Sequence, residues 1–149
     1  MRPSLRTLCF ALLVLAGCTR TPIADAPDAG ESPQAQQWES RRMDDYRFDF
    51  EQQCFCLREQ TLPVTIEVRD GRVARVVVRT TGQDLTGREN LRWPTVPELF
   101  RLVDQARQSG TEPLVVRYDE QLRYPTYIEA GSLAADAGVI YRATNLRPL

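Results

Sequence analysis

The sequence predicts an α+β domain. We expect a mostly antiparallel sheet of about five or six strands, with one main helix and a short N-terminal helix packed on one face. Three observations lead to this fold class. Residues 62–80 alternate apolar and polar side chains around an Asp-Gly pair, which is typical of a β-hairpin. Residues 92–110 carry an apolar stripe at helical spacing. Alternating segments then return and run to the end of the chain.

The domain is expected to begin with a short helix over residues 35–46, with Trp38 on its buried face. A strand should follow, because apolar residues recur at every second position from Tyr46 onward. These residues share one parity: Tyr46, Phe48, Phe50, Cys54 and Cys56. Gln52 interrupts the apolar face and is a plausible place for a bend.

The hairpin over 62–80 is the clearest element. A three-residue loop, Arg69 to Gly71 with Gly71 in the left-handed conformation, gives the better register. It would place Val64, Ile66 and Val68 on the same face as Ala74, Val76 and Val78. A two-residue turn would instead set Ile66 opposite Arg75.

The main helix has a capping box, Thr95-x-x-Glu98, at its start and Gly110 as its stop. Pro97 is tolerated in the first turn. The expected apolar stripe consists of Val96, Leu99, Phe100, Val103 and Ala106. The alternating segments that follow predict strands over residues 113–120, 124–130 and 138–146.

The first residues indicate a secretory signal. Arg2 and Arg6 precede an apolar run that is far shorter than the ~20 residues a membrane-spanning helix needs. The run ends in Leu15-Ala16-Gly17-Cys18, which resembles the lipobox of bacterial lipoproteins. The resemblance implies that Cys18 becomes the lipidated N-terminus, and two or three acyl chains would anchor it stably to a membrane. Thr19, where an aspartate would signal inner-membrane retention, favours the outer membrane.

Three regions follow from these patterns: a lipoprotein signal peptide over 1–17, the lipidated Cys18 with a flexible tether over 18–34, and a single α+β domain over 35–149. The tether is rich in Pro, Ala, Asp and Gly and cannot bury enough apolar surface to fold. We expect a periplasm-facing protein of the bacterial cell envelope.

Composition narrows the chemistry. The chain has 19 basic residues, all arginine, against 20 acidic residues, and it has no histidine. The arginines are spread along the chain, so we expect no nucleic-acid partner. Without histidine, Ser–His pairs and His-bearing zinc sites are excluded. We expect no metal and no cofactor.

The order of motifs resembles a family of small secreted bacterial domains, domain-of-unknown-function family 6174. The matching positions are Trp38, Tyr46, Phe48, Cys54, Phe55, Cys56, Asp70, Gly71, Thr95, Glu98, Leu99, Phe100, Tyr118, Asp119, Tyr124, Pro125, Asp136 and Tyr141. Such domains commonly have a glycine before the Tyr-Pro pair, where this chain has Arg123. The resemblance implies a lipoprotein or secretory signal and no established activity.

Cys54 and Cys56 allow three interpretations. Two cysteines alone cannot complete a structural zinc site, so a metal is disfavoured. In an oxidising periplasm a local disulfide is favoured, although residues i and i+2 of an extended strand lie ~6.5–7 Å apart and the bridge needs a bend. A redox-active pair stays as an alternative, but the setting lacks the helix N-terminus and cation cluster that activate a thiol.

No catalytic set is evident. Tyr118, Asp119, Tyr124 and Asp136 are the best candidates for a polar site, with turn stabilisation as the favoured role. We expect a lipid-anchored, non-enzymatic binding module with an envelope protein as possible partner. The alternatives are a periplasmic thiol–disulfide protein using Cys54 and Cys56, and a small hydrophobic-ligand carrier. The carrier's pocket would be lined by Phe48, Phe50, Leu99 and Phe100.

Overall fold

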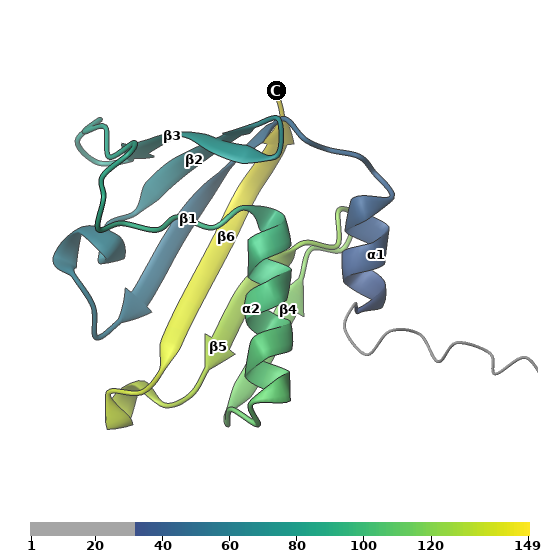
Figure 1. Ribbon diagram of the computed structural model, residues 1–149, viewed down its shortest axis with the longest axis vertical. Helices are drawn as coiled ribbons and strands as arrows, with labels where there is room; N and C mark the ends of the chain where they lie inside the picture. The colour runs from purple at the N-terminus through teal and green to yellow at the C-terminus, as the bar shows by residue number, and fades with distance from the viewer. Residues whose placement is uncertain (1–31) are drawn as a thin grey trace, which may run out of the picture.

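The computed structural model describes residues 32–149. The predicted signal peptide, the lipidation site Cys18 and the predicted tether up to residue 31 lie outside these described residues. The α+β fold class is confirmed: six antiparallel strands form one sheet, and two α-helices accompany it (Figure 1). The strands are β1 (Tyr46–Cys54), β2 (Val64–Arg69), β3 (Arg72–Val78), β4 (Leu114–Tyr118), β5 (Pro125–Ala130) and β6 (Val139–Pro148).

The strand order is β3-β2-β1-β6-β5-β4, so the first three strands form one half of the sheet and the last three the other half. The helix α2 (Val96–Gln108) joins β3 at one edge to β4 at the opposite edge. It contacts β5 and β4. Figure 1 shows the chain between β3 and α2 crossing in front of β1 and β6 on the way.

The second α-helix, α1 (Pro33–Glu39), is shorter than the 35–46 segment expected from the sequence. It also begins two residues earlier, so Pro33 and Gln34 belong to the helix and not to the predicted tether over 18–34. It ends at Glu39, and the chain reaches β1 through a link in which Arg42 has a positive φ of 50°. Trp38 is buried, with its ring edge-on to the rings of Tyr46 and Tyr124 at centroid distances of 5.4 and 6.3 Å.

The start of α2 follows the predicted capping box. The Thr95 hydroxyl accepts from the Glu98 N–H at 3.4 Å, and the Glu98 carboxylate accepts from the Thr95 N–H at 2.7 Å. All five residues of the predicted apolar stripe are buried. The helix ends where expected, with Gly110 at φ 65° supplying the left-handed residue that terminates many helices.

One buried hydrogen bond ties α2 to the sheet. The hydroxyl oxygen of Tyr46 in β1 accepts from the N–H of Val96, the first residue of the helix, at 3.0 Å. Such an N–H has no partner within its own helix and would otherwise be buried unpaired. Burial raises the pKa of the Tyr46 hydroxyl to about 12, because ionisation would place a charge in the core.

The predicted loop of the β2–β3 hairpin is wrong, and so is the predicted face of Ala74, whereas Val76 and Val78 face the core as expected. Asp70 and Gly71 form a two-residue turn with φ of 48° and 68°, and Arg69 pairs directly with Arg72. A bulge in β3 then corrects the register: Glu67 pairs with Arg75 but Val68 pairs with Val73. Ala74 is therefore exposed, and Val73 packs against the core in its place.

The remaining turns carry further left-handed residues. Arg123, in the position where the family commonly has glycine, has φ 65°. The left-handed conformation that glycine would adopt freely is thus kept by an arginine, at a cost on the order of 1–2 kcal/mol. Another bulge lies in β6 at Asn145 (φ 55°), opposite the start of β1, rather than at Gln52.

The face of the sheet opposite α2 is polar. Arg79 pairs with Asp49 at 3.6 Å and with Glu51 at 3.3 Å. Arg117 and Arg142 lie over the ring of Tyr127, 5.3 and 5.5 Å from its centroid. Solvent can therefore cover this face, and the apolar core lies wholly on the helix side.

We predict that Tyr46 makes the fold sensitive to alkali. The unfolded chain loses the Tyr46 proton near pH 10 and the folded chain near pH 12, so stability is present below pH 10 and falls between these values. The expected fall is up to about 3 kcal/mol in the free energy of urea unfolding.

The Tyr46→Phe variant should lose about 1 kcal/mol at pH 7, because the Val96 N–H loses its acceptor. Its free energy of unfolding should also fall less at alkaline pH. The part of the fall that remains comes from Tyr124 and Tyr141, whose pKa values burial also raises. An unchanged alkaline fall in this variant would refute the role given to Tyr46.

Candidate functional site

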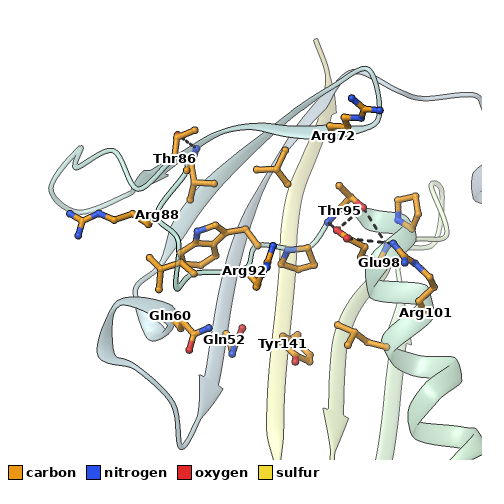
Figure 2. Close-up of a pocket in the computed structure, with 18 of the residues that line it drawn as sticks. Gln52, Gln60, Arg72, Thr86, Arg88, Arg92, Thr95, Glu98, Arg101 and Tyr141 are labelled. Carbon is orange, nitrogen blue, oxygen red and sulfur yellow. Dashed lines mark hydrogen bonds and ion pairs between the residues drawn. The ribbon is translucent and has the colours of Figure 1, made fainter.

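A groove of about 1000 Å³ opens on the helix side of the sheet (Figure 2). Residues 86–95, before α2, form one wall, and Arg101, Leu102 and Gln105 of α2 form the other. Gln52 of β1 and Tyr141 of β6 lie on its floor. We call it the helix-side groove. It was not foreseen from the sequence.

The wall formed by residues 86–95 is held at the edge of β3. Asp84 forms a β-bridge with Val77, and Leu85 is buried with its N–H donating to the Val76 carbonyl at 2.9 Å. Hydrogen bonds from the Thr86 hydroxyl and N–H hold the pKa of the Asp84 carboxyl below its usual range, with a smaller contribution from Arg75. These contacts fix where the wall begins, and the capping box fixes where it ends.

The floor of the groove is partly aromatic. The Trp93 ring lies at 90° to that of Phe50, with centroids 6.3 Å apart, and Tyr141 stacks on Phe50 with centroids 6.0 Å apart. Burial raises the pKa of the Tyr141 hydroxyl. The Trp93 indole N–H is buried and has no hydrogen-bond partner among residues 32–149.

The rim of the groove is rich in arginine. Arg72, Arg88 and Arg92 line it, and none of them lies within 4.0 Å of a carboxylate in the part of the chain that the structure describes. A fourth arginine, Arg101, pairs with Glu98 at 3.4 Å. Glu89 also lines the groove, so four arginines stand against two carboxylates and the groove keeps a surplus of positive charge.

The structure brings Cys54 and Cys56 together as a bonded pair, with Cα atoms 5.3 Å apart. This is shorter than an extended strand allows, because β1 ends at Cys54 and the chain bends at residues 55–56. Phe55, between the two cysteines, is 86% exposed. The Gln52 side-chain amide donates to the Cys54 sulfur at 2.9 Å, so one residue of the groove floor also contacts the bridge.

Of the four residues considered for a polar site, Tyr118, Asp119 and Tyr124 lie together at the turn between β4 and β5, and Asp136 lies apart from them. Tyr118 stacks on Phe100 at 6.2 Å, and Tyr124 is buried against Trp38. The Asp119 carboxylate accepts from the N–H groups of the two residues that follow Glu120, which makes it a turn residue. Asp136 follows the far end of β5, roughly 17 Å along that strand from the turn.

The residues expected to line a hydrophobic-ligand pocket are Phe48, Phe50, Leu99 and Phe100, and all are buried in the core. Their side chains fill the space between helix and sheet. The open volume lies beside this core instead, where the sheet face carries Gln52 and Tyr141. In the described residues, no group of three or more Cys, Asp or Glu side chains could hold a metal ion.

Comparisons with known proteins add one match. Residues 31–148 match the model of a family of unknown function, DUF6174. No curated protein and no solved structure matches the chain. Among residues 32–149, the structure contains no helix with the length and apolar character needed to cross a membrane.

We predict that the bridge between Cys54 and Cys56 is a local clamp. It closes a loop of about three residues, for which chain entropy gives only about 1.6 kcal/mol of stabilisation. The Cys54→Ser/Cys56→Ser variant should lose about this much in urea unfolding and keep its fold. A loss above about 4 kcal/mol would contradict a local role, since that is the range of bridges closing long loops.

Proposed function

Because the chain belongs to a family of unknown function (DUF6174), its own residues have to indicate its role, and we propose that it is a lipid-anchored binding module of the bacterial cell envelope. The helix-side groove is its binding site. The module holds an envelope component there and performs no chemistry on it. One observation carries this proposal: the groove combines open volume with three arginines that lack a carboxylate partner within residues 32–149.

The free energy that the fold forgoes by leaving the groove open supports a binding role. A stable fold has no need to leave about 1000 Å³ open beside its core, because apolar side chains would gain free energy by filling it. Unpaired arginines along one rim also repel each other. The open volume can admit a ligand, and the arginines favour a negatively charged one, as clefts lined by charges of one sign generally do.

The anchor is the second part of the proposal. Acyl chains on Cys18 would hold the protein in the outer membrane, facing the periplasm, and residues 18–32, which precede α1, would act as the tether. The fifteen residues from Cys18 to Ser32 would span about 20 Å if they behave as the tether that their composition predicts. Such a span keeps the groove close to the membrane surface. The short helix α1 would link tether and sheet through its buried Trp38.

A thiol–disulfide role for Cys54 and Cys56 is the second candidate, favoured by the exposure of Cys56 and of Phe55 between them. The reduction potential separates the two functions. Structural bridges have potentials below about −300 mV, whereas oxidising catalytic pairs lie near −120 to −200 mV. We expect a value in the structural range.

The binding function is tested by photo-crosslinking in intact cells. A photoreactive amino acid at Arg88 or Gln105, on the two walls of the groove, should give discrete adducts. The same amino acid at Val115 or Arg117, on the opposite face of β4, should give none. A Cys18→Ser variant should lose lipid labelling and most of the adducts. Absence of adducts from both groove positions in the anchored protein would rule out the groove as the binding site.

A further inference from the structure

The ligand class can be narrowed, an inference that rests on the binding function proposed above. We propose that the helix-side groove binds an acidic saccharide, meaning a sugar chain that carries carboxylate or phosphate groups. The positions of the charges, the polar side chains of the floor and the aromatic rings beside them each support this class.

The charges are spread out rather than gathered. Arg72 comes from the start of β3, Arg88 and Arg92 from the chain before α2, and Arg101 from the helix itself. In Figure 2 Arg92 lies over the middle of the groove, whereas Arg72 and Arg88 lie at separate places on the rim. A single anionic headgroup would contact one of these guanidinium groups. A ligand with acidic groups at intervals can contact several, and arginine pairs well with both carboxylate and phosphate.

The N-terminus of α2 does not supply an anion site. Its first N–H groups are already used by Tyr46 and by the Thr95 hydroxyl, and the Glu98 carboxylate stands beside them. The positive charge available to a ligand therefore comes from the arginine side chains alone.

Three glutamines suit a ligand with many hydroxyl groups. Gln52, Gln60 and Gln105 line the groove, and Gln52 and Gln60 lie at the same end of it as Tyr141 (Figure 2). Each amide offers both donors and an acceptor, which a sugar hydroxyl can satisfy at once. Among residues 32–149, the side chains of Gln60 and Gln105 have no hydrogen-bond partner, so both are free to bind.

The same glutamines argue against an acyl chain. A lipid tail laid along the floor would cover the Gln60 amide and the amide oxygen of Gln52, whose N–H group already donates to the Cys54 sulfur. These groups would lose water without gaining a partner, which costs free energy for each. Sugar rings present hydroxyls at their edges and C–H groups on their faces. The Trp93 and Tyr141 rings can pack against those faces while the glutamines bind the edges.

The test uses the full chain, purified in a neutral polyoxyethylene detergent. Tryptophan fluorescence reports binding, because Trp93 lines the groove and Trp38, the other tryptophan of residues 32–149, is buried in the core. The acidic probes are hyaluronan tetrasaccharide, which alternates glucuronate with N-acetylglucosamine, and glucose 6-phosphate. The matched neutral probe is chitotetraose in its fully N-acetylated form, which has equal length and neither carboxylates nor free amines. Sodium octanoate represents an acyl anion.

We expect hyaluronan tetrasaccharide to bind at least about tenfold more tightly than chitotetraose, with an affinity that falls as sodium chloride rises from roughly 0.02 M to 0.5 M. The Arg88→Gln/Arg92→Gln variant should lose about tenfold in affinity, because two of the unpaired charges are gone. The control Arg117→Gln, on the opposite face of the sheet, should bind as the wild type does.

Three results would overturn the inference: equal affinity for the neutral and the acidic tetrasaccharide, binding of octanoate alone, or no binding of either acidic probe. Each leaves the proposed binding function standing if groove positions still form adducts in cells. Absence of those adducts would instead remove the binding function itself, so the two failures are distinguishable.

Discussion

The structure depends on a mismatch of width between one helix and six strands. Six strands spaced about 4.8 Å apart span about 24 Å, whereas an α-helix with its side chains is about 10 Å wide. One helix of 13 residues therefore cannot cover the apolar face of this sheet. It lies over β5 and β4, and the rest of the face must be covered by other parts of the chain.

Two segments supply that cover, and neither is complete. The chain before α2 places Leu85 and Trp93 over the β1–β3 half, and α1 contributes Trp38 near the turn between β4 and β5. Between the chain before α2 and α2 itself, the C-terminal part of β1 and the N-terminal part of β6 stay open. There the floor changes from Phe50 to Gln52. The groove is thus a direct consequence of the topology, and the polar residues on its floor keep it from being a gap in the core.

The two walls of the groove meet at one fixed point, the first turn of α2. Thr95, Glu98 and the Tyr46 hydroxyl together fix the first turn of α2, and the residues immediately before it carry Arg92 and Trp93. A displacement of this turn would move both the helix wall and the loop wall. Stability of the fold and shape of the site are therefore coupled through the same few hydrogen bonds.

Local signals in the sequence identified most of the elements. The capping box, the apolar stripe of α2 and the parity of β1 each depend on neighbouring residues, and the structure agrees with them. The predicted three-residue loop between β2 and β3 was wrong, because a bulge at Val73 and Ala74 restores the register that a two-residue turn would otherwise shift. Alternation alone cannot tell a longer loop from a compensating bulge.

The site was harder to foresee because its residues come from β1, β3, β6, the chain before α2 and α2 itself. Arg88 and Arg92, which precede Trp93, are visible in the sequence. Only the strand order places Tyr141 next to Gln52. The cysteine pair attracted attention in the sequence, whereas the structure makes it a neighbour of the site, joined to the floor through the Gln52 amide.

The most direct test of the groove as the binding site is a map of backbone amide chemical shifts of the full chain on adding hyaluronan tetrasaccharide. We expect the shifted amides to cluster at residues 86–95, on α2 near Leu102, and around Gln52 and Tyr141. Shifts gathered instead around Tyr127 on the opposite face, or at the exposed Phe55, would contradict it.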